Sequence, residues 1–204
     1  TMSDLIWQPP SGPPCQDFSL ANNKKSTTRA NLTIQFAKII ANIKPTMFVM
    51  ENVCTIRRSE HLSKAISIFK QAGYGLTQRV IDASRVGVPQ MRQRFFLIGY
   101  RFKEDDFFGE ALDHGLSDKR TTVRDHLGEQ LDFDHYYTHP RSYKRRAIFS
   151  VDEPAATIRR VNRPIPSTYK LHPADKCAVT KALRNLSTEE RALLQTFPRS
   201  FKFA

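Results

Sequence analysis

The sequence predicts an α/β protein in which a partial doubly wound sheet ends in an antiparallel hairpin, followed by a small irregular β region. Two observations carry this prediction. Apolar strand-like runs alternate with helical stripes over residues 1–81, which is typical of a parallel sheet with helical crossovers. The stretch 82–94 then shows no helical pattern, although a parallel crossover usually needs a helix. The strands on either side of this stretch should therefore run antiparallel.

The first expected strand covers residues 4–7 and runs into a proline-rich segment at 8–14, which cannot be regular structure. A helix follows over about residues 29–43, because five apolar side chains recur on one helical face. These side chains are Leu32, Phe36, Ile39, Ile40 and Ile43. Pro45 ends this helix, because a proline cannot continue its hydrogen bonds.

Three further strands and one helix are expected before residue 103. The run 46–50 is apolar throughout, as a strand covered on both faces should be. A helical stripe comes next, and Gly73 stands where a C-cap glycine belongs. The stripe consists of Leu62, Ala65, Ile66 and Phe69. Residues 76–81 and 95–98 complete the set as the third and fourth strands.

The pattern weakens after residue 103. Residues 104–134 are acidic and are typical of a surface connector. Residues 135–182 are rich in Pro, Arg, Tyr and His, with short strand-like runs at 147–151 and 156–158.

Residues 183–204 contain the signal of one short helix. Ser187 followed by Glu190 is a capping-box pattern, in which each side chain bonds the backbone of the other. This local structural role fully explains Glu190. The helix is expected to end near Phe197 and Pro198.

Composition places the chain among globular proteins. Its 204 residues are 40% hydrophobic and 25% charged, which excludes a disordered tail, a coiled coil and a disulfide-rich secreted module. No apolar run approaches the roughly 20 residues of a membrane span, and no signal peptide is visible. The widely spaced Cys15, Cys54 and Cys177 form no CxxC pair, which favours a reducing compartment. The 6 histidines lack metal-ligand spacing, so no metal site is expected.

The formal net charge of +12 is unevenly distributed. Residues 1–103 carry +10 and residues 135–204 carry +9, whereas the segment 104–134 between them carries −7. A basic surface is the usual footprint of a polyanion, most often a nucleic acid. The alternative is a solvated cationic face without a ligand, and charge alone leaves both interpretations open.

Polar side chains converge on one edge of the predicted sheet. Cys15 lies in the loop after the first strand, and Glu51 and Asn52 follow the second. Arg92 and Arg94 open the fourth strand, which runs the other way and so begins at the same edge. Ligands of open α/β sheets bind at this edge. A cysteine beside arginines favours a nucleophilic thiolate, and a carboxyl can act as a general acid.

Each of these residues also has a purely structural interpretation. A cysteine in a loop is more often inert than catalytic, a Glu-Asn pair after a strand is often a turn, and Arg-x-Arg is common in a basic protein. The hypothesis of a reaction centre rests on their convergence rather than on any one of them.

Four sequence strings, in order along almost the whole chain, carry a more specific signal. They are Gly12-Pro-Pro-Cys-Gln-Asp-Phe-Ser19, Met50-Glu-Asn-Val53, Gln90-Met-Arg-Gln-Arg94 and Arg184-Asn-Leu-Ser-Thr-Glu-Glu-Arg-Ala-Leu-Leu-Gln-Thr-Phe-Pro198. Together they resemble the signature of the bacterial DNA (cytosine-5-)methyltransferases. The resemblance implies a Rossmann-like methyltransferase sheet with a target-recognition region. It divides the chain into a catalytic part (1–103), an acidic connector (104–134), the recognition region (135–182) and a return segment (183–204).

The resemblance also implies a role for each matching residue. Cys15 would attack carbon 6 of cytosine, Glu51 would hold and protonate ring nitrogen 3, and Arg94 would contact the flipped base and the Cys–Glu centre. Supporting roles fall to Gln16, Ser19, Asn52 and Arg92. The chemistry fits, because cytosine is a poor electrophile and needs both a thiolate and a proton donor. Neither Cys15 nor Glu51 could reach the base inside a duplex, so the base must be flipped out.

Duplex DNA is the expected partner, and the basic residues of the recognition region are the expected contacts. They are Arg141, Arg145, Arg146, Arg159, Arg160, Arg163 and Arg184. We expect at least one of Arg159, Arg160 and Arg163 to read a base edge, the alternative being that all three hold phosphates. Nothing local explains Arg184, which in the family braces the recognition region against the catalytic domain.

The methyl donor implied by the resemblance is S-adenosyl-L-methionine. The family's glycine-rich cofactor loop and its closing segment are not found in the chain, so most of this site is expected in further segments or in a second polypeptide. We therefore expect part of a larger or split enzyme, in the cytoplasm of a bacterium and with no membrane association. The alternative is a non-catalytic DNA-binding subunit or relic of such an enzyme.

Overall fold

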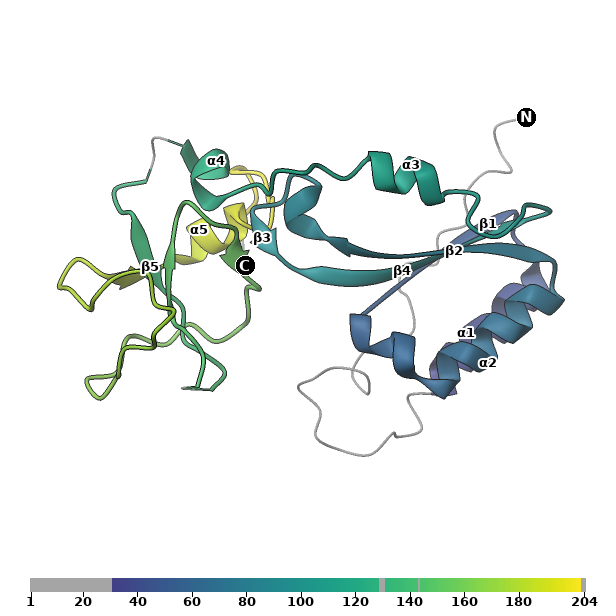
Figure 1. Ribbon diagram of the computed structural model, residues 1–204, viewed down its shortest axis with the longest axis horizontal. Helices are drawn as coiled ribbons and strands as arrows, with labels where there is room; N and C mark the ends of the chain where they lie inside the picture. Colours follow the sequence, from purple (N-terminus) through teal and green to yellow (C-terminus); the bar gives the residue numbers. More distant parts are fainter. Residues whose placement is uncertain (1–30, 129–130, 143, 203–204) are drawn as a thin grey trace. The chain divides into compact units, whose positions relative to one another are not determined.

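The computed structural model describes residues 31–128, 131–142 and 144–202, whose course is shown in Figure 1. The chain forms two compact units, which we describe separately. The first contains the described residues up to Ile81 together with 93–116, and the second contains 82–92 together with the described residues from Ser117 onward. Within these ranges, no helix is long and apolar enough to cross a membrane.

A three-stranded sheet forms the centre of the first unit. Its strands, in spatial order, are β1 (Met47–Asn52), β4 (Gln93–Arg101) and β2 (Tyr74–Asp82). β4 runs antiparallel to β1, so that Asn52 at the end of β1 lies opposite Phe95 near the start of β4. β1 therefore ends at the edge where β4 begins, as predicted. The strand expected at residues 4–7 lies outside the described residues.

β2 and β4 form the predicted antiparallel hairpin. At one end, the Phe102 N–H donates to the Gly73 carbonyl at 3.2 Å. At the other, the Ala83 N–H donates to the Arg92 carbonyl at 3.0 Å. The start of β2 thus lies beside the end of β4, and the end of β2 lies beside the start of β4. This arrangement is that of antiparallel strands. The connection contains the short 3₁₀ turn η4 (Ala83–Arg85) and no α-helix.

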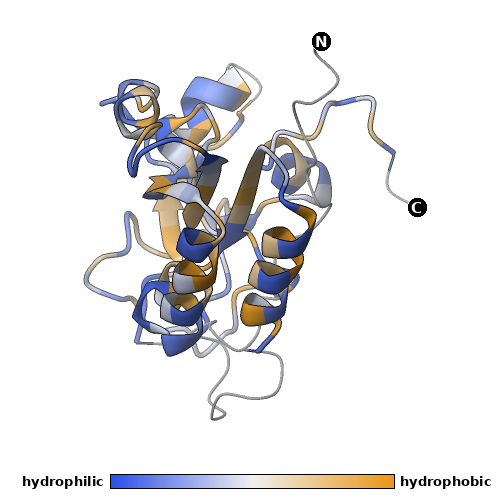
Figure 2. Cartoon of the chain, turned by 90° about the vertical axis from the view of Figure 1, so that its right-hand side faces the viewer, coloured by the Kyte–Doolittle hydropathy of each residue, from blue (hydrophilic) through white to orange (hydrophobic). Residues whose placement is uncertain are grey.

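Two helices, α1 (Asn31–Ile43) and α2 (Glu60–Gln71), lie side by side and share one hydrophobic core with the sheet (Figure 2). Ser59 precedes α2 as its N-cap, and its hydroxyl oxygen accepts the His61 N–H at 3.1 Å. Gly73 follows the end of α2 at φ +85°, the left-handed conformation that glycine adopts without strain. Both helices were predicted from their apolar spacing.

The core-facing side of α1 differs from the predicted stripe. The buried residues are Thr33, Ala37 and Ile40. Three residues of the predicted stripe, Leu32, Ile39 and Ile43, are 40%, 50% and 54% exposed. Ile40 of the predicted stripe is buried and Phe36 packs against the core, so the buried face is rotated from the stripe toward Thr33 and Ala37.

Aromatic rings fill the space between the helices and the sheet. The Phe48 ring of β1 lies 4.4 Å from the Phe69 ring and 5.1 Å from the Tyr74 ring, measured between centroids. Gly99 of β4 leaves room for Phe48, because a Cβ at this position would lie 2.1 Å from the Phe48 ring. Glycine at position 99 therefore leaves the space that the Phe48 ring occupies.

The first part of the acidic segment folds along β2, which is an edge strand of the described sheet. Asp105 accepts a backbone N–H of β2 at 2.8 Å. Arg79 of β2 pairs with Asp106 at 2.7 Å and with Asp113 of α3 (Gly109–His114) at 3.0 Å. These acids cover an edge that would otherwise expose unpaired backbone groups. Residues 104–116 therefore belong to the fold of the first unit, and the rest of the acidic segment belongs to the second.

The second unit is built from short strands. β5 (His135–Tyr137) lies between β6 (Ile148–Ser150), which is antiparallel to it, and β8 (Arg184–Asn185), which is parallel. β3 (Gln90–Met91) and β7 (Ala155–Ala156) form a separate parallel pair. Short strand runs were predicted for this part of the chain.

A capping box begins each of the two short helices of the second unit. In α5 (Thr188–Leu193), the Ser187 hydroxyl accepts the Glu190 N–H at 3.1 Å and the Glu190 carboxylate accepts the Ser187 N–H at 2.6 Å, as predicted. The helix ends at Leu193, earlier than expected.

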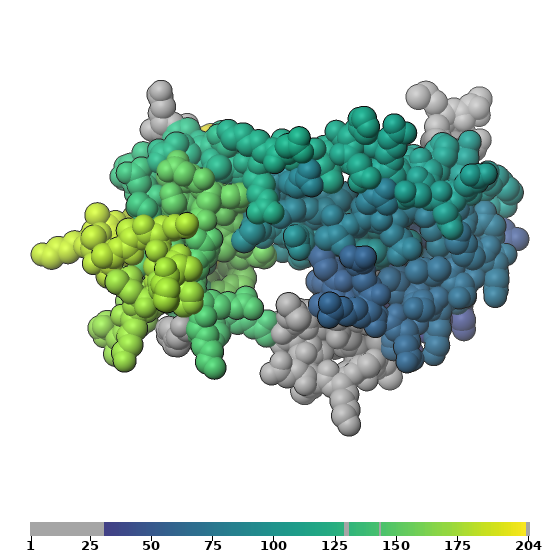
Figure 3. All heavy atoms as spheres, in the orientation of Figure 1, coloured from purple at the N-terminus to yellow at the C-terminus, as the bar shows by residue number. Residues whose placement is uncertain are grey.

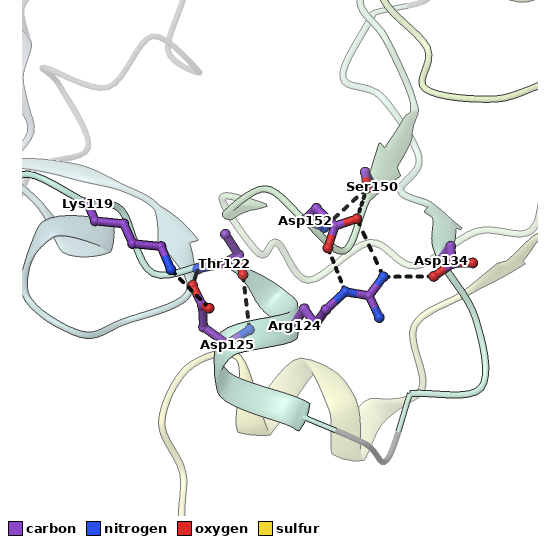
Figure 4. Close-up of polar contacts among 7 residues, drawn as sticks. All are labelled: Lys119, Thr122, Arg124, Asp125, Asp134, Ser150 and Asp152. Atoms are coloured by element: carbon purple, nitrogen blue, oxygen red, sulfur yellow. Dashed lines mark hydrogen bonds and ion pairs between the residues drawn. The ribbon is translucent and has the colours of Figure 1, made fainter.

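In α4 (Val123–Leu127), Thr122 and Asp125 form the second capping box, shown in Figure 4. Arg124 of the same helix bonds Asp134 at 2.7 Å and Asp152 at 2.5 Å. One guanidinium thus joins α4 to the residue that precedes β5 and to the turn that follows β6.

Adding a methyl group at position 99 should destabilise the first unit. In Gly99→Ala, the new Cβ would overlap the buried Phe48 ring, so we expect the free energy of unfolding to fall by about 1–3 kcal/mol. Urea unfolding followed by circular dichroism measures this change. Gly115→Ala is the matched control, because its Cβ would meet its nearest atom at 3.4 Å, and should change stability by less than about 0.5 kcal/mol. Equal losses in the two variants would contradict the described packing.

Candidate active site

The end of β1 carries an ion pair between two of the predicted site residues. Arg94 Nε lies 2.8 Å from Glu51 Oε1. The strand register explains the contact, because Glu51 lies opposite Phe96, and Arg94, two residues earlier in β4, projects from the same face of the sheet. Arg94 Nη1 also donates to the Gln93 carbonyl at 2.8 Å. The guanidinium is therefore held from two sides.

The geometry of this pair leaves part of the carboxylate available. The Glu51 side chain is 47% exposed and the Arg94 side chain 22%. Oε1 faces Arg94, whereas within the described residues Oε2 makes no hydrogen bond. The pair thus presents one oriented carboxylate oxygen at an open edge of the sheet.

Asn52 orders the backbone as it leaves β1. Its side chain is fully buried, and its Oδ1 accepts the Val53 N–H at 2.8 Å. Glu51 and Asn52 are the last two residues of β1, whereas the sequence pattern placed them after the strand. The difference is favourable for a reaction centre, because strand hydrogen bonds fix Glu51 more firmly than a turn would.

Of the residues predicted at this edge, the described part of the first unit shows Glu51, Asn52 and Arg94. Cys15, Gln16 and Ser19 lie outside the described residues, so their meeting with Glu51 stays a prediction. Arg92 belongs to the second unit, where its carbonyl accepts the hydrogen bond of Ala83.

Two arginines predicted to contact DNA are held by carboxylates of their own unit. Arg146 makes a bidentate pair with Glu153 at 2.8 and 2.9 Å. Arg184 makes a bidentate pair with Glu190 at 2.7 and 2.9 Å and also bonds Asp132 at 3.1 Å. The sequence showed no local partner for Arg184, and the structure corrects this: Glu190 both caps α5 and binds Arg184.

The remaining predicted DNA contacts differ in how they are held. The Arg159 guanidinium donates a hydrogen bond to the His139 carbonyl, which is part of the same unit. Burial lowers the pKa of His139, and the charges of Arg163 and Arg159 lower it further. Four others are exposed at the surface of the second unit: Arg141, Arg145, Arg160 and Arg163. Their contacts with DNA stay a prediction.

Asp175 organises the second unit, although the sequence analysis did not single it out. Its carboxylate accepts the N–H groups of Ala147 and Ile148 at 2.8 and 2.9 Å, the His172 N–H at 2.8 Å and the Tyr169 hydroxyl at 2.6 Å. Burial alone would raise the pKa of Asp175, but these hydrogen bonds hold it below its ordinary value. The only sequence signal is an isolated Asp in a basic segment, which does not predict such a role.

Comparison with known proteins identifies the family. Residues 10–204 match the family described as C-5 cytosine-specific DNA methylase. This chain belongs to the C-5 cytosine-specific DNA methylase family. The match includes all four strings that carried the resemblance, and with them the Glu51–Arg94 pair.

The relatives are type II methyltransferases. The chain is 52% identical to M.HgiDI of Herpetosiphon aurantiacus, over 94% of this chain and 62% of that protein. It is also 52% identical to M.HindV of Haemophilus influenzae, over 98% of this chain and 66% of that protein. The chain therefore spans about two thirds of the length of these relatives. A structural match covers 62% of this chain and 39% of the S. pombe Dnmt2 methyltransferase, with a TM-score of 0.47 and 16% identity.

Removing the charge of Asp175 should weaken the second unit in a pH-dependent way. Asp175→Asn loses hydrogen bonds to a charged acceptor, so we expect the free energy of unfolding at pH 7 to fall by about 1.5–3 kcal/mol. The folded-state pKa of Asp175 lies below the ordinary 3.8, so its contribution is complete above about pH 4 and is lost as the pH falls through the folded value. Urea unfolding from pH 7 to pH 3 measures the difference between the two proteins.

The matched control is Asp118→Asn, because the Asp118 side chain is fully exposed and reaches Arg85 only at 3.6 Å. This variant should stay within about 0.5 kcal/mol of the unmodified chain. A difference for Asp175→Asn that does not shrink toward acid pH would contradict the role of its charge.

Proposed function

We propose that this chain carries the reaction centre of a DNA (cytosine-5-)methyltransferase, which methylates carbon 5 of cytosine in duplex DNA. The observation that carries the proposal is the Glu51–Arg94 pair at the end of β1, since an oriented carboxylate is what activation of the cytosine ring requires. Family membership and the order of the four strings support it. The site acts on a base that has been turned out of the helix, because its edge is inaccessible in a stacked pair.

Glu51 and Arg94 act together on the base. In its carboxylic acid form Glu51 gives the proton of Oε2 to ring nitrogen 3 and takes it back when the thiolate leaves, while Arg94 orients the group through Oε1. Protonation at nitrogen 3 withdraws electrons from the ring and makes carbon 6 electrophilic. Asn52 keeps the end of β1 in place, so the carboxylate is oriented before the base arrives.

Cys15 is the nucleophile in this proposal. Its thiolate forms a bond to carbon 6, and the electron pair of the carbon 5–carbon 6 double bond moves to carbon 5. Carbon 5 then takes a methyl group. Loss of the carbon 5 proton to water restores the double bond as the carbon 6–sulfur bond breaks and releases the thiolate.

S-adenosyl-L-methionine, the methyl donor of the proposed reaction, supplies an electrophilic methyl group when bound. The described residues at the end of β1 are a carboxylate, a guanidinium and a buried amide, which suit a polar base edge. We therefore assign none of these three residues to the cofactor. The two relatives named above come from bacteria, and we propose that the protein acts on DNA in the cytoplasm of such a cell.

A covalent adduct tests the proposal directly. A full-length protein containing this chain is incubated with S-adenosyl-L-methionine and a duplex in which the target cytosine carries fluorine at carbon 5. The fluorine cannot leave as a proton, so the enzyme should remain bonded to the DNA through Cys15 and survive denaturing electrophoresis. Cys15→Ser should abolish the adduct and lower methyl transfer to normal DNA by at least about 10³-fold.

Cys177→Ser is the matched control. Burial raises the pKa of the Cys177 thiol, with a further contribution from Asp175, so this cysteine favours the thiol over the thiolate. The control should form the adduct as the unmodified protein does. Salt-dependent duplex binding without any methyl transfer would instead indicate a non-catalytic DNA-binding protein, and full turnover of Cys15→Ser would exclude the proposed chemistry.

A further inference from the structure

Two adjacent arginines, Arg57 and Arg58, come shortly after Glu51 and Asn52 in the sequence and have no role in the proposed reaction. After Asn52 the chain enters the 3₁₀ turn η3 (Cys54–Arg58), which ends with Arg57 and Arg58. Figure 1 shows this turn between the end of β1 and the start of α2, and Figure 3 shows that the same segment reaches the surface. Both side chains are exposed.

The turn that carries them is rigidly attached to the first unit. Ile56 is fully buried in the hydrophobic core. Its N–H donates to the Val53 carbonyl at 3.1 Å, and its carbonyl accepts the Ser59 N–H at 2.8 Å. Ser59 in turn caps α2. Arg57 and Arg58 are thus exposed on a backbone fixed from both ends, which suits a preorganised binding surface.

The two arginines also lack the carboxylate partners found elsewhere. Arg79, Arg124 and Arg184 each pair with two acids of their own unit. Within the described residues, neither Arg57 nor Arg58 forms an ion pair, even though Glu60 lies close in sequence. Their two positive charges are therefore available to an external anion.

We propose that Arg57 and Arg58 bind the DNA backbone next to the base that Glu51 receives. This inference rests on the proposed function. A guanidinium matches a phosphate bidentately, and two neighbouring guanidiniums on a fixed turn suit consecutive phosphates of one strand. Only a few residues separate them from Glu51, so they hold the strand beside the extruded nucleotide. The contact is independent of sequence, because it involves no base edge.

The experiment measures duplex binding by the full-length protein as a function of salt. Each lost phosphate contact lowers the slope of log affinity against log salt by about 0.9 for B-DNA. The double variant Arg57→Gln/Arg58→Gln should therefore lower the magnitude of this slope by about 1 to 2. Affinity should fall by the same factor on duplexes with and without a methylation target. The single variants should each show part of the effect.

Lys38→Gln/Lys44→Gln is the matched control, since it also removes two exposed charges from the first unit. Lys44 precedes β1, at the opposite end of the strand from Glu51, roughly 20 Å away at the usual rise per residue. The control should leave the slope unchanged within about 0.3. An unchanged slope in the arginine variant, or an equal change in the lysine variant, overturns the inference.

Methyl transfer and DNA binding by the unmodified protein distinguish a failure of this inference from a failure of the proposed function. If it transfers methyl groups and binds duplex DNA while the arginine variant keeps the original slope, only the phosphate contact is wrong. If the unmodified protein forms no adduct and transfers no methyl group, the proposed function itself fails. Circular dichroism of both double variants confirms that the exposed substitutions leave the fold intact.

Discussion

The antiparallel register between β1 and β4 is the constraint on which the candidate site depends. Buried side chains set this register: Phe48 and Met50 of β1 and Phe95 and Leu97 of β4 are almost completely inaccessible. A slip of one residue would turn the buried set outward, which the core does not permit. The same register aligns the end of β1 with the start of β4. The Glu51–Arg94 pair is therefore a consequence of core packing at the other positions of the two strands.

Carboxylates divide the basic residues of the chain into two groups. Arginines that meet acids, such as Arg79, Arg124 and Arg184, join segments of one unit and contribute little net charge to its surface. Arginines without such partners, such as Arg57 and Arg58, carry the positive field that a polyanion would encounter. The basic residues behind the net charge of +12 therefore serve two purposes: some stabilise the fold through ion pairs, and others remain available to bind an anion.

The sequence predicted the elements with strong periodicity and the topology of the hairpin. α2, β1 and β4 were predicted because their burial follows from apolar spacing, and the capping box of α5 because its signal is local. Rotation of α1 was not predicted, since Leu32, Ile39 and Ile43 fit a helical stripe equally well and only packing decides which face is buried. The Arg184 and Asp175 contacts were not predicted either, because their partners are brought together by the fold.

A double-mutant cycle on Glu51 and Arg94 tests the central claim, that Arg94 acts mainly by fixing the Glu51 carboxylate. Single-turnover methyl transfer is measured for the full-length protein, for Glu51→Gln, for Arg94→Ala and for the double variant. Either single change should slow transfer by about 10²–10⁴-fold, because the proton donor is lost or misplaced. We expect Arg94→Ala to slow transfer by less than about 3-fold once Glu51 is already Gln. An equal effect of Arg94→Ala in both backgrounds would show that the two residues act independently and would contradict the account.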